Sequence, residues 1–373
     1  MKIKRYLQEK ITEKFNKGKA IVVIGPRQVG KSTLMNEILS KMENVLSVNG
    51  DDFGVQQRFS LPDKEHITRL IKNYAIIFID EAQRIPNIGL TSKIIIDQFP
   101  HVQLVLSGSS AFDLNNQINE TLTGRKWEFN LFPISMAEIQ NEFGWLEADS
   151  QLENRIIFGM YPDVLNYKGE EEVVLNSMVN SYLFKDILAL SGIKKPDFLQ
   201  KLTQALALQI GSEVSYNELS QLLGANKETV SNYIDLLEKA FVVFRVNAFS
   251  RNMRNEIKNN RKIYFYDTGL RNALISNFNP LNIRNDKGVL WENFLISERI
   301  KLLKYQQIFS NTYFWRTAQQ QEVDWIEEKG GIINAYEFKW KANERYKFPK
   351  GFVETYNAQT KMINRDNYSE FVM

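Results

Sequence analysis

One stretch near the start of the chain decides its fold: Gly25-Pro26-Arg27-Gln28-Val29-Gly30-Lys31-Ser32. The apolar run Ile21–Ile24 before it predicts a buried strand, and Thr33–Leu39 after it predicts a helix. The glycines of such a loop let backbone N–H groups converge on phosphate oxygens, and the helix dipole faces the anion. Lys31 can reach the β- and γ-phosphates, while the Ser32 hydroxyl can ligate Mg²⁺. The stretch therefore predicts a nucleotide-binding loop in which Gly25 to Thr33 contact the phosphates.

A second apolar run ends in two acidic residues, Ala75-Ile76-Ile77-Phe78-Ile79-Asp80-Glu81. A near-continuous apolar run of this length is typical of a parallel strand that is buried on both faces. At its carboxyl end Asp80 would hold the hydration shell of Mg²⁺, and Glu81 would polarise an attacking water. The alternative is a solvated acidic pair at the end of an edge strand. Because Lys31 and Ser32 are also present, the residues favour catalysis, with Ser32 and Asp80 as metal-binding groups.

Other polar groups follow predicted strands. Val102–Leu106 leads into Ser107-Gly108-Ser109-Ser110, which either senses the γ-phosphate or is an ordinary strand-to-turn transition. Asp51-Asp52 after Val45–Val48 leaves the same two alternatives, because open α/β sheets bind ligands at the carboxyl ends of their strands. Arg125 is either a surface arginine or a catalytic one, which would stabilise transition-state charge in its own subunit or in a neighbour's.

A family resemblance rests on five segments, which are Gly25–Leu34, Ile77–Pro86, Ser107–Ser110, Gly124-Arg125 and Leu131–Ser135. Together they resemble the prokaryotic AAA-type ATPases that have a C-terminal domain of unknown function, over nearly the whole chain. The resemblance implies ATP as the nucleotide. The lack of an Asn-Lys-x-Asp segment, which would bind guanine, agrees with that expectation.

Composition limits the remaining possibilities. The 373 residues are 43% hydrophobic and 24% charged, which predicts two or three globular domains. There is no cysteine and there are only two histidines, so disulfides, thiolate metal sites and a histidine-rich metal centre are not expected. A net charge of +3 is too small to require a nucleic-acid partner. Without a signal peptide or a long apolar span, we expect a cytoplasmic protein that does not enter a membrane.

The pattern of predicted elements divides the chain into four parts. Residues 1–145 alternate strands and helices, which predicts an α/β domain with a doubly wound parallel sheet, the P-loop ATPase core. Residues 146–200 predict a helical lid or connector, residues 201–250 a winged-helix-like segment, and residues 251–373 an α/β domain. At the start of the helical region, Ser135 and Glu138 stand at capping-box spacing, and apolar positions from Val173 to Leu190 continue the helical pattern.

Three short helices are predicted at Leu202–Ile210, Ser215–Leu223 and Lys227–Ala240, with Phe241–Phe244 beginning a β-wing. Capping by Ser215 and Asn226 would start the second and third helices. A DNA-binding helix-turn-helix would place four polar residues in a groove, Lys227, Thr229, Ser231 and Asn232. Because Glu228 opposes the single lysine of that helix, an architectural winged helix is the favoured alternative. The basic stretch Arg251, Arg254, Lys258, Arg261 and Lys262 predicts either phosphate contacts or a solvated linker.

A second group of chemically active residues occurs near the C-terminus: Glu292, Asp324, Glu337 and Lys339. Ile332–Phe338 predicts a strand, and the side-chain period of two puts Glu337 and Lys339 on one face. Two carboxylates could hold Mg²⁺ while Lys339 activates water for phosphodiester cleavage. The pattern is similar to the restriction-endonuclease-like nuclease core, with Glu292 as its helical acid, although Val323 rather than proline precedes Asp324. Surface carboxylates, or remnants of a lost site, are the alternative.

Three classes of function follow from these residues. The preferred one is an ATPase that uses ATP, releases ADP and requires Mg²⁺, and whose nucleotide state acts on DNA or a protein partner, as a monomer or as an oligomer. The second is a Mg²⁺-dependent nuclease that ATP gates. The third is a binding module or small-molecule kinase, which Glu81 disfavours because that residue would activate water rather than a bound acceptor.

Overall fold

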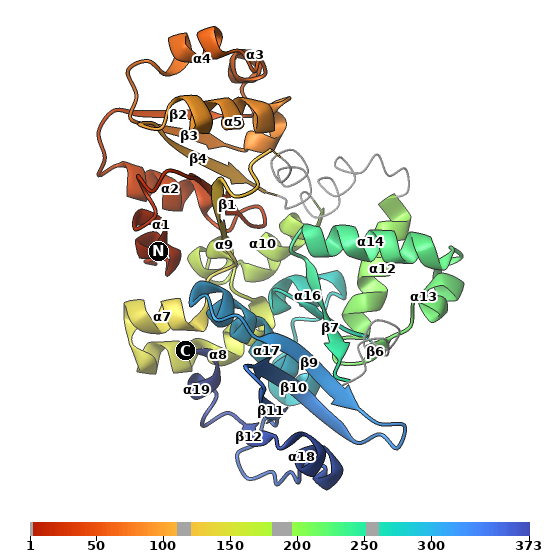
Figure 1. Cartoon of the computed structure of the whole chain (residues 1–373). Helices are drawn as coiled ribbons and strands as arrows, with labels where there is room; N and C mark the ends of the chain where they lie inside the picture. The colour runs from red at the N-terminus through yellow and green to blue at the C-terminus, as the bar shows by residue number, and fades with distance from the viewer. Residues whose placement is uncertain (1–2, 110–120, 181–195, 251–260) are drawn as a thin grey trace. The chain divides into compact units, whose positions relative to one another are not determined.

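The computed structural model describes residues 3–109, 121–180, 196–250 and 261–373 (Figure 1). They form two compact units, which are described one at a time. The first unit runs to Pro133 and also includes Lys239–Phe241, and the second begins at Ile134.

The first unit is built on a five-stranded sheet. Its strands are β1 (Ala20–Ile24), β2 (Val45–Asn49), β3 (Ile76–Asp80), β4 (Gln103–Gly108) and β5 (Lys126–Asn130). Their order is β2-β3-β4-β1-β5, and every neighbouring pair is parallel. This confirms the predicted α/β fold with a parallel sheet. Since the strands are parallel, all five carboxyl ends lie along one edge.

Helices flank this sheet and connect its strands (Figure 1). They are α1 (Leu7–Thr12), α2 (Lys31–Leu39), α3 (Phe53–Phe59), α4 (Lys64–Ile71), the short 3₁₀ helix η1 (Ala82–Arg84) and α5 (Ile88–Gln98). Every residue of β1 and β4 is buried, as are the apolar residues of β3, whereas β2 and β5 at the sheet edges are partly exposed. The continuous apolar runs of the sequence therefore occupy the centre of the sheet, where both faces are covered.

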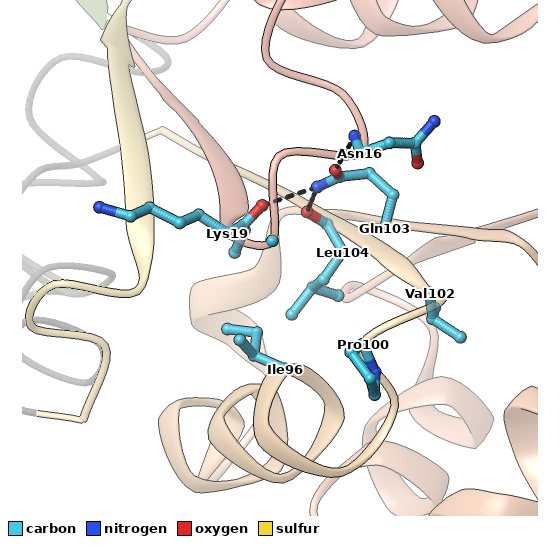
Figure 2. A pocket seen from close by; sticks show the side chains of 9 residues that line it. Asn16, Lys19, Ile96, Pro100, Val102, Gln103 and Leu104 are labelled. Atoms are coloured by element: carbon cyan, nitrogen blue, oxygen red, sulfur yellow. Dashed lines mark hydrogen bonds between the residues drawn. The ribbon is translucent and has the colours of Figure 1, made fainter.

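Figure 2 shows a small cavity at the amino-terminal edge of this sheet, beside the first residues of β1 and β4. The Gln103 side chain organises it: its amide nitrogen donates to the carbonyls of Lys19 and Leu104, and its oxygen accepts from the Asn16 N–H. The cavity measures about 20 Å³. A space of this size holds about one water molecule, so it is not a nucleotide site.

The second unit contains most of the helices. They are α7 (Met136–Phe143), α8 (Trp145–Phe158), α9 (Pro162–Asn166), α10 (Glu171–Met178), α12 (Pro196–Leu208), α13 (Tyr216–Leu223), α14 (Lys227–Lys239), α16 (Thr268–Leu274), the 3₁₀ helix η3 (Leu281–Ile283), α17 (Lys287–Tyr305), α18 (Lys350–Tyr356) and α19 (Ser369–Val372). The capping box predicted for Ser135 and Glu138 begins α7. That helix was assigned to the ATPase domain, but it lies in the second unit. Residues 181–190 of the helix predicted to end at Leu190 lie outside the described residues.

A seven-stranded sheet forms the other layer of this unit. Its strands are β6 (Glu213–Val214), β7 (Val243–Ala248), β8 (Arg261–Phe265), β9 (Asn311–Arg316), β10 (Glu322–Lys329), β11 (Ile332–Phe338) and β12 (Gln359–Ile363), in the order β12-β11-β10-β9-β7-β8-β6. The sequence pattern divided this region at residue 250. In the structure β7 pairs with both β8 and β9, so one sheet crosses that boundary. This pairing joins strands far apart in sequence, which local periodicity does not reveal.

Helices α8 and α16 of this unit approach each other closely at a glycine. Asp267 caps α16 by accepting the Leu270 N–H, and its other oxygen accepts the Met160 N–H. One residue into the helix, a Cβ on Gly269 would lie 2.0 Å from the Phe158 carbonyl oxygen at the end of α8. Because no larger residue fits, glycine sets how closely α16 and α8 approach.

We predict that Gly269→Ala lowers the free energy of unfolding of this unit by about 1–3 kcal/mol, the usual cost of overpacking a core. The matched control is Gly288→Ala in α17, where an added Cβ meets no atom within 4 Å. This control should be neutral or stabilising by up to about 1 kcal/mol, because alanine favours helix. Urea denaturation followed by tryptophan fluorescence measures both, since the buried Trp291 and Trp325 lie in this unit. Equal midpoints for the two variants would contradict the packing argument.

Candidate functional site

The loop predicted to bind phosphate lies between β1 and α2, between a strand and a helix as predicted. Gly30 has φ +90° and forms the N-cap of α2, a left-handed conformation that glycine adopts without strain. Gly25 is required for a different reason, since a Cβ there would lie 2.1 Å from the Leu131 carbonyl oxygen. The loop is thus tightly bent at one end and packed against the segment after β5 at the other.

Lys31 is the first residue of α2, and its ammonium group turns back over the loop. It donates hydrogen bonds of 2.9 Å to the carbonyls of Gly25 and Pro26, and the residue is only 5% exposed. The ammonium charge is therefore held over the first residues of the loop that leads into the N-terminus of α2. This combination is a strong anion-binding arrangement.

Asp80 joins the loop to the acidic strand. Its Oδ2 accepts a 2.5 Å hydrogen bond from the Ser32 hydroxyl, and its Oδ1 accepts one from the Ser107 hydroxyl. Asp80 ends β3, Ser107 lies near the end of β4, and Ser32 is in the helix that follows β1. These three strands are consecutive in the sheet, in the order β3-β4-β1. The structure thus brings together Ser32, Asp80 and part of the predicted Ser107–Ser110 cluster. Ser110 itself lies outside the described residues.

Glu81 follows with a strained backbone. Its φ is +48°, which is uncommon for a side chain of this size and typical of functional sites. Its Oε2 accepts a 2.5 Å hydrogen bond from the Gln83 amide, which also donates to the Ser109 hydroxyl at 3.0 Å. Gln83 therefore fixes the orientation of Glu81 relative to β4. The sequence pattern predicted no role for Gln83, and its position two residues after Glu81 was the available signal.

The Asp51-Asp52 pair has other partners. Asp52 caps α3 by accepting the Val55 N–H at 3.0 Å, and Asp51 forms a 3.4 Å ion pair with Arg84. Both contacts are at exposed positions beside the carboxyl edge of the sheet. Of the two alternatives left open for this pair, these contacts support the local structural one.

Arg125 lies at the opposite edge of the sheet from the phosphate loop. Its carbonyl accepts the N–H of Ala20, the first residue of β1, while the loop follows the last residue of that strand. The five residues of β1 separate the two by about 16 Å. The guanidinium forms a 2.8 Å ion pair with Asp97. A role for Arg125 at the site of its own subunit is therefore not supported by the geometry.

Arg5 also contacts the loop, although the sequence predicted no role for it. Its guanidinium donates to the Val29 carbonyl in the phosphate loop at 2.7 Å and to the Phe132 carbonyl at 2.6 Å, and the residue is 7% exposed. It holds the loop to the segment after β5. No local sequence pattern indicates this contact, because the residues that it joins are far apart in the chain.

The second unit gathers the C-terminal residues into one buried cluster. Asp324 on β10 accepts the Phe338 N–H of β11 at 2.9 Å, and Lys339 donates to Glu337 at 2.7 Å. Glu292 on α17 electrostatically influences both Asp324 and Glu337. The four predicted residues are therefore neighbours, and Glu292 is on a helix as expected.

Lys262 is an unpredicted member of this cluster. It is 1% exposed, and its ammonium group lies 3.0 Å from Glu292 Oε1 and 2.5 Å from Glu322 Oε1. The hydroxyl of Tyr264, also on β8, donates to Glu292 at 2.5 Å. The prediction that Lys262 belongs to a phosphate-contacting or solvated basic stretch is therefore wrong. Arg261 of the same stretch contacts the ring and hydroxyl of Tyr216, and Arg251, Arg254 and Lys258 lie outside the described residues.

Burial and mutual charge shift the acidity of this cluster. Burial, reinforced by the carboxylates of Glu292 and Glu337, raises the pKa of Asp324 well above its usual range. Burial likewise raises the pKa of Glu337, an effect that the neighbouring Lys339 partly offsets. Burial lowers the pKa of Lys262, but Glu292 and other acidic neighbours raise it well above its ordinary value overall. Among the described residues, no three acidic or histidine side chains are arranged to hold a metal ion.

The helices predicted as a helix-turn-helix are present. Ser215 accepts the Glu218 N–H to begin α13, and Asn226 accepts the Thr229 N–H at the start of α14, as predicted. Lys227, Glu228 and Asn232 are exposed on α14, whereas Thr229 and Ser231 are partly buried. The exposed side chains of Lys227 and Glu228 thus carry opposite charges next to each other in the chain, as the sequence indicated.

Three family models match parts of the chain. Residues 17–140 match the family model described as an AAA domain. Residues 149–282 and 287–369 match two models described as domains of unknown function, DUF8612 and DUF4143.

Relatives extend over most of the chain. An uncharacterized protein of Mycobacterium tuberculosis is 27% identical over 86% of this chain and 70% of its own length. Another uncharacterized protein, from Haemophilus influenzae, is 26% identical over 68% of each chain. The chain also resembles the solved structure of the Walker-type ATPase paby2304 of Pyrococcus abyssi, with a TM-score of 0.50 and 15% identity over 72% of this chain and 94% of that one.

No helix in the described part of the chain is both long enough and apolar enough to span a bilayer. The phosphate loop, the parallel sheet and the matching family model agree with one another. Residues 17–140, which carry the phosphate loop and most of the parallel sheet's helices and strands, match an AAA domain, and the fold resembles that of a Walker-type ATPase.

Proposed function

We propose that the chain binds ATP together with Mg²⁺ and hydrolyses the γ-phosphate by in-line attack of water. The observation that supports this most directly is the contact between the Ser32 hydroxyl and the Asp80 carboxylate at 2.5 Å. P-loop ATPases hold their magnesium through these two groups. Their contact shows that both groups reach the same point at the edge of the sheet.

The residues present fit a magnesium ion. Mg²⁺ prefers oxygen ligands and keeps several of its waters, so one hydroxyl and one carboxylate suffice as protein groups. Ser107, which also donates to Asp80, keeps the carboxylate oriented. Bound there, the ion would neutralise charge on the β- and γ-phosphates.

Each remaining side chain has a distinct role in the proposed reaction. Lys31 binds the β- and γ-phosphates and stabilises the charge that spreads over the transferred group. Glu81, held by Gln83, accepts a hydrogen bond from the attacking water and orients it. The backbone N–H groups from Val29 to Ser32 contact the phosphates at the N-terminus of α2.

We further propose that the nucleotide state acts on DNA or on a protein partner through the second unit. The support is the element order α12-β6-α13-α14-β7-β8, in which β8 pairs with both β6 and β7. A winged helix has this order of helices and strands. The opposed charges of Lys227 and Glu228 favour a protein partner over a DNA groove.

Lys31→Ala should abolish binding of Mg²⁺–ADP, because the loop loses its only lysine and the charge that faces the phosphates. Isothermal calorimetry measures the binding. The exposed Lys93→Ala variant on α5 is the control and should bind as the wild type does. Unchanged affinity in Lys31→Ala would contradict the assigned site.

Glu81→Gln should keep ATP bound and lower the turnover number about 10²–10⁴-fold, the usual contribution of one acid–base group. Phosphate release in the absence of any acceptor measures turnover and also tests the kinase alternative, since a kinase would release none. The exposed Glu65→Gln variant on α4 is the matched control. Wild-type turnover in Glu81→Gln would remove that residue from the mechanism.

A second candidate function is Mg²⁺-dependent cleavage of DNA by the acidic cluster of the second unit. It is favoured by one observation: Glu292 and Asp324 are neighbours of Glu337 and Lys339 in the fold, although they are distant from them in sequence. Two carboxylates that hold Mg²⁺, with a lysine beside one of them, form a site that can activate water. Lys262 opposes this function, because its ammonium pairs with Oε1 of Glu292, one of the carboxylates of this site.

If the cluster cuts DNA, Lys339→Met should slow nicking of a supercoiled plasmid about 10²–10⁴-fold. The control Glu328→Gln changes a partly exposed carboxylate on the same strand as Asp324 and should cut at the wild-type rate. Gel electrophoresis in Mg²⁺ buffer separates the products, and phosphate release should be equal in all three proteins. Wild-type protein that leaves the plasmid intact would exclude this second function under those conditions.

A further inference from the structure

The phosphate loop has two direct connections to one short segment of the first unit, Leu131-Phe132. Arg5 forms the first, because its guanidinium donates to the Val29 carbonyl at 2.7 Å and to the Phe132 carbonyl at 2.6 Å. Val29 immediately precedes Gly30 and Lys31, so this carbonyl belongs to the part of the loop that faces the phosphates. One buried cation thus holds two backbone segments at a fixed separation.

The second connection is a backbone contact at the other end of the loop. The Leu131 N–H donates to the Ile24 carbonyl at 2.7 Å, and the Leu131 carbonyl lies so close to Gly25 that any Cβ there would be 2.1 Å away. Leu131 therefore has almost no freedom to move independently of Gly25. Gly25 and Val29 are thus connected to two consecutive residues, Leu131 and Phe132.

These residues lie where the chain leaves the first unit. Pro133 is the last residue of that unit in this region, and Ile134 is the first of the second. The Phe132 carbonyl that Arg5 binds is thus next to the junction in the covalent chain. Movement of Leu131-Phe132 has to be taken up at Pro133 and Ile134.

Nucleotide binding would disturb this arrangement through Lys31. Its ammonium donates to the carbonyls of Gly25 and Pro26. A triphosphate competes for the same ammonium, since lysine binds phosphate oxygens as a point charge. When Lys31 turns to the phosphates, these two carbonyls lose a donor, and Gly25 is the residue that contacts Leu131.

We propose that Arg5 is a positioning residue that transmits the nucleotide state of the phosphate loop to the junction at Pro133-Ile134. The proposal rests on the proposed function, since it requires that the loop binds a nucleotide. It assigns Arg5 no contact with the nucleotide. The role is to make Phe132 follow the displacement of Val29.

Arginine is suited to this role in a way that lysine is not. The guanidinium is planar and presents several N–H groups in fixed directions, so its two nitrogens can hold two carbonyls at once. An ammonium on a flexible stem can replace one of these bonds while keeping the charge. Arg5→Lys therefore loosens the connection without removing the cation.

The test measures hydrogen exchange in peptides that cover Leu131 to Ile134, with and without saturating Mg²⁺–AMP-PNP, and calorimetry measures binding of the same nucleotide. In the wild type, nucleotide should change exchange at the Leu131 and Phe132 amides by about fivefold or more, the lower range of typical coupling between sites. In Arg5→Lys the nucleotide should still bind, and this response should disappear. Arg5→Gln, which keeps one donor without the charge, is made in parallel so that the result does not depend on one variant folding. Arg69→Lys on the exposed face of α4 is the matched control and should respond like the wild type.

Each result has a defined meaning. A folded variant that binds nucleotide and keeps the full response overturns the proposal, as does a wild type that binds nucleotide without any response. A folded variant that no longer binds nucleotide also overturns it, because Arg5 would then serve the binding site itself. A wild type that binds no nucleotide means instead that the proposed function has failed, and the coupling fails with it.

Discussion

The Asp80 carboxylate accepts hydrogen bonds from two hydroxyls, those of Ser32 and Ser107, and the proposed nucleotide site depends on this arrangement. The three residues meet because β3 lies next to β4 and β4 lies next to β1, with all strands parallel. This strand order brings the phosphate loop after β1 and the acid at the end of β3 to the same edge of the sheet. Burial of the apolar strands thus determines the geometry of a polar site at their ends.

Contacts within the first unit also restrain the backbone conformation of the loop. Gly25 packs directly on the Leu131 carbonyl, and Arg5 holds the Val29 and Phe132 carbonyls together. A glycine-rich loop has high conformational freedom, and the close packing of Gly25 on the Leu131 carbonyl restricts it. The same contacts connect the loop to Leu131 and Phe132, which directly precede Pro133 near the end of the unit.

In the second unit, charged side chains are buried in one cluster. Its cluster contains Glu292, Asp324 and Glu337 together with Lys262 and Lys339, and burying unpaired charges would cost several kcal/mol for each ion. Pairing with the lysines and the raised pKa of Asp324 both reduce that cost. Lys262 reaches the cluster because β8 joins the same sheet as β10 and β11. One sheet therefore unites segments that the sequence pattern had placed in two domains.

The sequence by itself determined the elements whose signal is local. The loop from Gly25 to Ser32, the acidic end of β3, the strand Ile332–Phe338 and the caps at Ser135 and Asn226 all follow from residues close together in the chain, because loop chemistry, strand periodicity and capping act over a few residues. Only the tertiary structure decided the roles of Arg5, Gln83 and Lys262, the position of Arg125 at the far edge of the sheet, and the limits of the two units. Most of these depend on which strands become neighbours, and β7 pairs with a strand more than sixty residues away because of the packing of the whole unit. Such long-range pairing leaves no local trace in a single sequence.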